Sequence, residues 1–392
     1  MPIRFLTAGE SHGPMLTTIL EGMPAGLPLE ASDIDTDMAR RQKGYGSGGR
    51  MHIEKDRVRI TAGLMNGETT GGPIAMLLEN RDFKNWKERD ITPITTPRPG
   101  HADLTGAVKY GYRELRLSLE RASARETAMR VAVGGVCKKF LAQFGIEILG
   151  YVTQIGDVKA HIPENADYHD LYDIAEANDV RSPDAQAADA MHKAIHTVKV
   201  NKDTLGGVFE VIALGVPPGL GSHVHYDRRL DAKLVGIMTG IQAMKGAEIG
   251  HAFENAGKPG SQVHDEIEPD GNGGIRRRSN RAGGLEGGIT TGDPIVVRVA
   301  MKPISTMLRG ADTVNLVTGD AERTVYERSD FCAVPRAVPV GEAMMAIVLA
   351  DALLEKLGGD SLSEMLPRYD NLRGNNFADL PMDNVEWRFG YE

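Results

Sequence analysis

The segment GESHGP near the N-terminus brings a carboxylate, a hydroxyl and an imidazole together between two glycines. His12 is a candidate general acid or base, because the pKa of a free imidazole, about 6.5, lies close to neutral pH. Taken alone, it fits an ordinary turn histidine equally well. Residues 9–13 also match the G-x-S-x-G pattern of hydrolases, which needs a helix directly after the serine. The following MLTTILEG predicts a strand instead, which disfavours a hydrolase.

Two further loops carry cationic side chains. TTPRPGHADLTG places Arg98 beside His101, and ARRQKGYGSGGR joins a basic helix end at Arg41 to a glycine-rich loop. Guanidinium groups and the backbone N–H groups of such loops bind anions well. Each loop alone is also compatible with a purely structural role, and neither contains the Walker A pattern G-x-x-x-x-G-K-[ST].

Four later segments add to this set. In ERASARE, Arg121 and Arg125 are four residues apart, on one face of a predicted helix, where a salt-bridged surface is the ordinary alternative. NRAGGLEGGITTGDPI has the glycines that a close approach of backbone to ligand requires, or is a hairpin linker. KPIST and ERSDFCAVPR add a lysine and Asp330. Two loop histidines, a carboxylate and several arginines, without a Cys/His metal cluster or a G-x-G-x-x-G fingerprint, indicate acid–base chemistry on a phosphorylated small molecule.

Composition excludes several classes of protein. The chain has 45 Lys and Arg against 54 Asp and Glu, a net charge of −9 that disfavours nucleic acid and anionic membranes as partners. Cys137 and Cys332 cannot form a disulfide framework or a four-thiolate zinc site. With no apolar signal core in MPIRFLTAGESHGP, we expect a cytoplasmic location. The longest apolar window, AMMAIVLADALL, is too short to span a membrane.

β-Branched runs bounded by glycine predict the strands. They are IRFLTA, MLTTILEGM, VRITAGLMNG, GGPIAMLLEN, IEILGYVTQIG, GGVFEVIALGV and DPIVVRVAM. Their hairpin-like spacing favours antiparallel or mixed sheets, and therefore the α+β class.

Three helices are predicted to pack against these sheets. One runs from an N-cap at Ser32 through Arg41, and one runs unbroken through LRLSLERASARETAMRVAVGGVCKKFLAQFG to Gly145. The third, GEAMMAIVLADALLEKLGG, is apolar on most faces, so it is expected between layers. We expect a single large domain over residues 1–392, with a polar helical surface insertion at about 161–200 and a loosely ordered tail at about 373–392.

Six motifs, in this order, closely resemble the chorismate synthase family from residue 4 to residue 357: GESHGP, RPGHADLTGAVKYG, ERASARETAMRVA, NRAGGLEGGITTGDPI, KPIST and RSDFCAVPRAVPVGEAM. The resemblance implies a lyase that converts 5-enolpyruvylshikimate 3-phosphate to chorismate and phosphate by 1,4-anti elimination, the last common step of the shikimate pathway towards aromatic amino acids. It implies a need for reduced FMN without net redox change. It also implies a β-α-β sandwich with central helices between antiparallel sheets, assembled as a homotetramer.

The resemblance also assigns roles to residues. His12 would have a protonation role at the flavin, His101 would protonate the departing phosphate, and Asp330 would assist proton removal through the flavin. Arg41, Arg98, Arg125 and Arg328 would bind the phosphate and carboxylates of the substrate, since a guanidinium group matches oxyanions in two contacts. The residues implied in FMN binding are Arg121, Ala122, Ser123, Gln242, Ala243, Gly287, Lys302, Pro303, Ile304, Ser305, Thr306 and Arg328.

One position departs from the family pattern. Where the family loop usually reads GYGRG, this chain has GYGSG, so Ser47 replaces an arginine that would face the substrate or a pyridine nucleotide such as NADP. Arg50 and Lys43 are candidates to compensate. No basis for an internal flavin reductase is evident, so an external flavin reductant is expected. A net-redox flavin oxidoreductase and a non-catalytic tetrameric scaffold are the alternatives.

Overall fold

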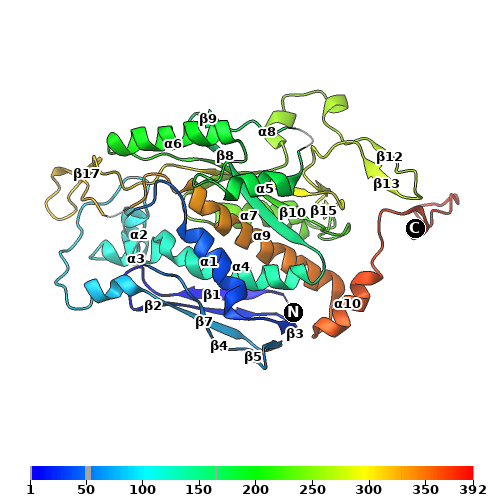
Figure 1. Ribbon diagram of the computed structural model, residues 1–392, viewed down its shortest axis with the longest axis horizontal. Coiled ribbons are helices and arrows are strands. Elements are labelled where there is room, and N and C mark those ends of the chain that lie inside the picture. Colours follow the sequence, from blue (N-terminus) through cyan, green and yellow to red (C-terminus); the bar gives the residue numbers. More distant parts are fainter. Residues whose placement is uncertain (1, 49–53, 164–165, 328, 392) are drawn as a thin grey trace.

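The computed structural model describes residues 2–48, 54–163, 166–327 and 329–391. Two antiparallel sheets enclose a layer of helices, so the predicted α+β class and the β-α-β sandwich are confirmed (Figure 1). The first sheet has the order β1 (Arg4–Ala8), β2 (Met15–Glu21), β7 (Ile74–Glu79), β4 (Arg59–Ala62). The second has the order β11 (Met244–Ile249), β16 (Ile295–Met301), β10 (Gly207–Leu214), β8 (Glu147–Ile155), β9 (Val158–Lys159).

Three helices fill the space between the sheets. They are α1 (Ala31–Gln42), α4 (Thr127–Ala142) and α9 (Val334–Leu357). On the β2 strand, Leu16, Thr18 and Leu20 are buried and alternate with exposed residues, so one face of the first sheet points to α4. α9 packs against β8 and β10 on its other side. One core cluster runs through both sheets and all three helices.

The contact between α4 and α9 is unusually close. A Cβ atom at Gly134 would lie 2.2 Å from the Cβ atom of Ala343, so only glycine allows the two helices to cross here. α9 is long and apolar enough to cross a membrane, but 94% of its apolar window is buried inside the protein. It is therefore the core helix that its sequence predicted. Cys137 on α4 and Cys332 just before α9 are also fully buried.

All three helix predictions need correction in part, beginning with the first two. The long helix expected up to Gly145 is three pieces, α3 (Arg116–Ala122), the 3₁₀ turn η3 (Ala124–Glu126) and α4. Ser123 breaks it, because its backbone is extended and its hydroxyl accepts a hydrogen bond from the N–H group of Arg125, as an N-cap does. The N-cap of α1 is Glu30, two residues before the predicted Ser32, and its N–H group donates to the Asp33 carboxylate.

The third predicted helix, α9, starts earlier than its sequence suggested. It begins at Val334 and contains Pro335 in the first turn and Pro339 in its interior. Proline is well tolerated in a first turn, where its missing N–H group has no helical partner to lose. The predicted end at the glycine pair 358–359 is confirmed.

The segment 161–200 contains α5 (Tyr168–Glu176) and α6 (Ala185–Val200), with Leu171 and Ala175 packed on the outer face of the second sheet. The remaining helices are α2 (Asp103–Tyr110), α7 (Leu230–Thr239), α8 (Ala252–Asn255) and α10 (Leu362–Asp370). The remaining strands are β3 (Ala25–Pro28), β5 (Leu64–Met65), β6 (Glu68–Thr70), β12 (Ile267–Pro269), β13 (Ile275–Arg277), β14 (Leu285–Glu286), β15 (Ile289–Thr290), β17 (Asp312–Val314) and β18 (Ala321–Arg323). Residues 381–391 of the tail have no regular structure and point away from the body (Figure 1).

Candidate active site

A cavity of about 490 Å³ opens at one end of the central helix layer. The ends of the elements form it: the β1–β2 loop, the end of α1, the loop before α2, the Ser123 corner, the loop after β16 and the start of α9. The predicted site residues that line it are His12, Arg41, Arg98, His101, Ala122, Ser123, Arg125, Gln242, Ala243, Lys302, Ile304, Ser305, Thr306 and Asp330. Five of the six motifs therefore contribute residues to one pocket, together with Arg41 at the end of α1 and the Gln242–Ala243 segment.

His12 is fixed by a carboxylate. The Nδ1 atom of His12 lies 2.8 Å from Oε1 of Glu120, and its backbone N–H group donates to Oε2 of the same residue at 2.7 Å. Trp86 lies against the imidazole ring, with 4.2 Å between the ring centroids. Burial alone would raise the pKa of Glu120, but the hydrogen bonds and charge of His12, with the charge of Arg116, lower it. This pairing holds the imidazole of His12 in one orientation.

His101 is held in the same way. Its Nδ1 atom lies 2.6 Å from Oδ1 of Asp103, whose carboxylate also accepts from Nε and Nη2 of Arg98 at 2.8 and 3.0 Å. Burial opposes ionisation of Asp103, yet the hydrogen bonds and charges of His101 and Arg98 hold its pKa well below the usual range. Nδ1 is engaged by Asp103, whereas Nε2 has only a longer contact, 3.4 Å, with Nη2 of Arg98, so Nε2 is the candidate nitrogen for proton transfer.

Arg41 and Arg125 lie in a buried cluster with the carboxylates of Asp56 and Glu54, the latter 3.6 Å from Nη2 of Arg125. Arg125 Nη1 lies 2.7 and 2.8 Å from the two oxygens of Asp56, and Arg41 Nη1 lies 3.2 Å from one of them. Burial lowers the pKa of Arg41 most, Asp56 opposes this, and the charges of Arg336 and Arg125 lower it further. An anion in the cavity would favour the charged form of Arg41.

Asp330 lies near the end of α1, to which Arg336 connects it. Its Oδ1 atom accepts from the N–H group of Gly48 at 2.7 Å, and its Oδ2 atom pairs with Nη1 of Arg336. Nε of Arg336 in turn donates to the carbonyl oxygen of Arg41 at 3.1 Å. The carboxylate is thus held in one orientation by both of its oxygens.

The remaining wall is polar backbone and short side chains. Lys302 Nζ donates to Ser305 Oγ at 3.0 Å, and burial, followed by the nearby charge of Lys245, lowers the pKa of Lys302. Gln242 donates through Nε2 to Glu126 at 3.0 Å, while its buried Oε1 atom has no hydrogen-bond partner among the described residues. Ala243 has φ of +69°, a strained conformation for alanine. An orphaned acceptor and a strained backbone at a cavity wall are features of ligand sites.

Comparison with known proteins agrees with this geometry. The family model described as "Chorismate synthase" matches residues 3–354. The chorismate synthase of Syntrophotalea carbinolica is 54% identical over 373 residues, which are 93% of this chain and 96% of the relative, and that of Aquifex aeolicus is 52% identical over 385 residues, covering 94% and 97%. A crystal structure of chorismate synthase superposes with a TM-score of 0.77 at 46% identity, covering 94% of this chain and 97% of that one. The chain belongs to the chorismate synthase family. It is therefore a carbon–oxygen lyase of the shikimate pathway.

Some residues that the family resemblance implied are not in the cavity. Arg121 is exposed and donates through Nη2 to the carbonyl oxygen and hydroxyl of Thr7, both at 2.9 Å. It does not share a helix face with the buried Arg125, because the break at Ser123 separates them. Gly287 lies in the exposed turn between β14 and β15, and Pro303 is also absent from the cavity lining. Arg328 lies outside the described residues.

The loop that departs from the chorismate synthase pattern closes on itself. Ser47 donates its hydroxyl to the carbonyl oxygen of Gly44 at 2.6 Å, whereas the neighbouring Gly48 lines the cavity. Arg50, the first candidate to compensate for the missing arginine, lies outside the described residues. The chain after Ser11 continues into β2, which agrees with the rejection of a hydrolase.

Sequence reasoning missed the residues behind the histidines. Asp103 stands two residues after His101, so a search for carboxylates near that histidine would have suggested it. Glu120 is 108 residues from His12, and only the fold brings the two together. Trp86 is one of only two tryptophans in the chain. Asp56 carries no local signal, because only the fold brings it between Arg41 and Arg125.

Proposed function

We propose that this member of the chorismate synthase family converts 5-enolpyruvylshikimate 3-phosphate to chorismate and phosphate by 1,4-anti elimination, with reduced FMN bound in the same cavity. The observation that carries the proposal is the joint placement of three buried arginines, two carboxylate-held histidines and Asp330 around one cavity. Neither charge alone nor histidines alone would distinguish an elimination from simple anion binding.

The arginines suit the anionic groups of this substrate. It carries one phosphate and two carboxylates, and Arg41, Arg98 and Arg125 line the cavity with their guanidinium groups anchored from behind. Arg41 and Arg125 share Asp56, and Arg125 also pairs with the buried Glu54, so both guanidinium groups are anchored by carboxylates. Anchored guanidinium groups bind oxyanions with little loss of side-chain entropy on binding.

His101 is the group that we assign to the departing phosphate. Asp103 holds its Nδ1 side, so a proton on Nε2 can be delivered into the cavity while the carboxylate stabilises the imidazolium. His12, held by Glu120, is assigned the second protonation role, and Asp330 the removal of the proton that the elimination releases. Positioned groups of this kind each contribute about 10²–10⁴-fold to the rate.

The cavity fits a flavin nucleotide on two observations. The orphaned Oε1 atom of Gln242 can accept from an N–H group of the ring, and Lys302 with Ser305 can hold the nucleotide phosphate. Backbone of Ala122, Ser123, Ala243 and residues 304–306 completes the wall. When bound, reduced FMN supplies electron density to the allylic centre that loses phosphate.

The direct test is an anaerobic assay of purified protein with 5-enolpyruvylshikimate 3-phosphate and dithionite-reduced FMN, in which chorismate and phosphate are followed together. Equal formation of both products is expected. Product from NADPH alone would add a reductase activity, and NADPH oxidation without substrate would favour a net-redox enzyme. His101→Ala should lower turnover about 10²-fold or more while FMN affinity survives. Wild-type turnover in that variant would remove the assigned role of His101.

We also propose a cytoplasmic homotetramer supplied with reduced flavin by an external reductant. The outer face of the first sheet supports an assembly, because Leu6 and Ile19, paired across β1 and β2, are 64% and 48% exposed. Light scattering after size-exclusion chromatography tests the oligomer, and a monomer at micromolar concentration would contradict it.

A further inference from the structure

Arg181 lies in the loop between α5 and α6, inside the segment that the sequence marked as a surface insertion. Its backbone has φ of +53°, which is unfavourable for a side chain of this size, and only 4% of its side chain is exposed. Its carbonyl oxygen accepts from the N–H group of Val152 on β8, so the loop is tied to the second sheet. A strained backbone at a buried loop arginine is retained only where surrounding contacts stabilise it, so the contacts of the Arg181 side chain are the next question.

The guanidinium group of Arg181 donates to three backbone carbonyls. Nη2 donates to the oxygen of Arg40 at 2.7 Å, and Nη1 donates to those of Lys43 at 3.1 Å and Pro335 at 2.5 Å. The first two belong to the C-terminal end of α1, where helix carbonyls lack helical donors. The third belongs to the first turn of α9.

The carbonyl of Pro335 has a particular need for this donor. In an α-helix it would accept from the N–H group of residue 339, four positions later, but that residue is Pro339, which has none. Arg181 therefore supplies the hydrogen bond that the helix interior cannot. Its own charge is balanced by Glu176, which accepts from Nε of Arg181 at 2.8 Å and from Nη2 of Arg40 at 2.9 Å.

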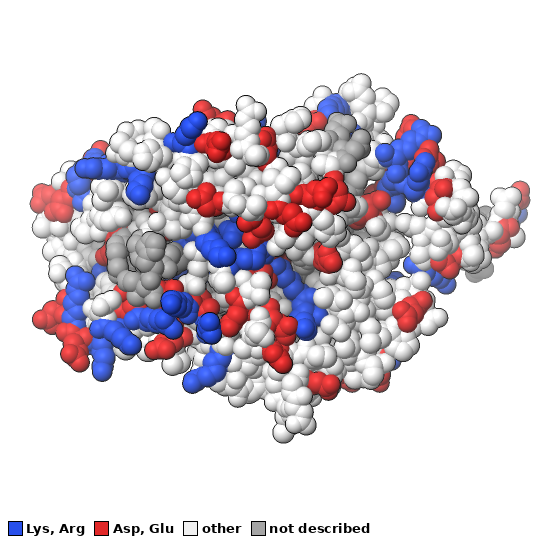
Figure 2. Space-filling view, in the orientation of Figure 1, with Lys and Arg blue, Asp and Glu red and all other residues white. Residues whose placement is uncertain are grey.

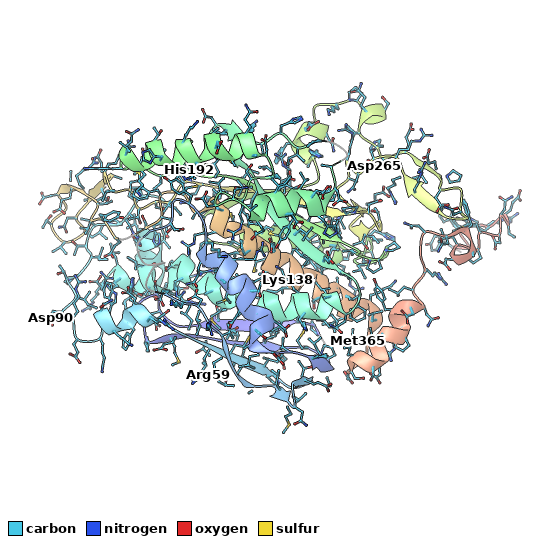
Figure 3. The ribbon with its side chains drawn as sticks, in the orientation of Figure 1. Arg59, Asp90, Lys138, His192, Asp265 and Met365 are labelled. Carbon is cyan, nitrogen blue, oxygen red and sulfur yellow. The ribbon has the colours of Figure 1, made fainter. Side chains whose placement is uncertain are left out.

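The network continues into the protein core. Arg40 is paired with both oxygens of the fully buried Glu342 on α9, which also accepts from Lys138 on α4 at 2.7 Å. Lys138 lies near the centre of the view in Figure 3, and Lys and Arg atoms alternate with Asp and Glu atoms over this part of the surface in Figure 2. α1, α4, α5 and α9 are thus joined through charged groups.

The segments clamped by Arg181 carry the cavity residues. Arg41 follows Arg40, and Arg336 follows Pro335. Arg336 bridges the two segments, because it donates to the carbonyl oxygen of Arg41 and pairs with Asp330. Arg181 itself is not among the cavity-lining residues. Its three hydrogen bonds fix the spacing between a substrate-binding arginine and the candidate proton acceptor.

We infer that Arg181 is a positioning residue, which sets the end of α1 against the start of α9 and so holds Arg41 and the Arg336–Asp330 pair in register for the substrate. The inference rests on the proposed function for its kinetic readout. The residues expected to hold FMN are carried by other segments, Ala122–Ser123, Gln242–Ala243 and 302–306. Loss of Arg181 is therefore expected to impair the substrate side of the site and spare the flavin side.

The test compares Arg181→Lys and Arg181→Gln with Arg277→Lys. Arg277 on β13 also makes ion pairs, with Glu286 and Asp293, and does not line the cavity, so it controls for the loss of a bonded arginine. We expect kcat/KM for 5-enolpyruvylshikimate 3-phosphate to fall about 10- to 100-fold in both Arg181 variants, since small misplacements at a site cost rates of that size. The Kd of oxidised FMN, from fluorescence quenching, should stay near the wild-type value. Equal losses in substrate and flavin binding would indicate a merely structural role and overturn the inference.

A rescue variant keeps the test independent of folding losses. Pro339→Ala restores an N–H group for the carbonyl of Pro335, so the effect of Arg181→Lys should be smaller in the Pro339→Ala background than in wild type. Full additivity of the two changes would contradict the assigned contact. If the wild-type protein formed no chorismate, this result would refute the proposed function but not the inference about Arg181. A crystal structure of Arg181→Lys then decides the inference, and an unchanged 3.1 Å bond from Arg336 to Arg41 would overturn it.

Discussion

The carboxylate of Asp103 offers the sharpest test of the active site, through the isosteric change Asp103→Asn. Four donors converge on it in the structure: the backbone N–H group and two guanidinium nitrogens of Arg98, and Nδ1 of His101. The amide of asparagine has one acceptor oxygen and no charge, so at least one donor loses its partner. The imidazolium that forms at His101 also loses its counter-charge.

The magnitude follows from the burial of this pair. The Asp103 side chain is 1% exposed and that of Arg98 is 9% exposed, so removing the charge leaves a buried guanidinium uncompensated, which costs about 3–5 kcal/mol of stability. Turnover should fall about 10²–10⁴-fold, the contribution of a positioned acid–base group. FMN binding should survive, because Asp103 does not line the cavity wall assigned to the flavin.

The assay is steady-state chorismate formation with dithionite-reduced FMN, together with urea unfolding and FMN titration of the same preparation. Asp227→Asn is the matched control, since His225 and Asp227 form the same His-x-Asp pair at 2.8 Å on the exposed surface. The control should behave as wild type. If Asp103→Asn binds FMN and keeps turnover near that of Asp227→Asn, the role given to the Asp103–His101 pair is wrong.

Three further expectations concern other parts of the molecule. Glu120→Gln should lower turnover about 10²-fold in the same assay, because His12 loses the carboxylate that orients it. An unchanged rate would show that the role assigned to His12 is wrong. Gly134→Val should destabilise the fold by about 1–3 kcal/mol or more in urea, because its Cβ atom would meet Ala343 at 2.2 Å; an unchanged midpoint would mean that α4 and α9 separate readily. The pKa values of Asp37, Asp103, Glu120 and Glu126 are lowered in the folded state, despite burial that raises them, by their cationic and hydrogen-bonding partners. These groups stabilise the fold above their unfolded pKa of about 4, and this contribution should be lost as pH falls below that value, so the urea midpoint should drop there.

Local sequence patterns predicted most of the strands and helices of the two sheets and the central layer. The alternation of residue types and the bounding glycines predicted the strands of both sheets. One face of each sheet is buried against helices and the other points away from them, so buried and less buried residues alternate along a strand with a period of two. β11 was missed, since MKGAEI is short, polar and at the sheet edge, where it depends on pairing with β16. The helix break at Ser123 was missed because helical periodicity continues on both sides of it, while the cap is a single hydrogen bond.

The candidate site also contains some residues that the sequence predicted and others that it did not. Residues inside compact motifs, such as His12, His101 and Lys302, were identified as chemical groups before their surroundings were known. Asp56 and Arg181 act through long-range contacts and belong to no motif, so only the packing of distant segments reveals them. Residue patterns report what a loop can bind, whereas the orientation of its side chains is decided by partners far away in the chain.

The burial of both thiols has a practical consequence for spectroscopy. Burial raises the pKa of Cys332 to about 12, and burial also raises that of Cys137, so neither offers a reactive thiolate at neutral pH. A single cysteine introduced on the surface can therefore be labelled in the otherwise native chain, without a cysteine-free background. Placed at Ser47, beside the cavity-lining Gly48, a fluorophore would report directly whether this loop rearranges when substrate arrives.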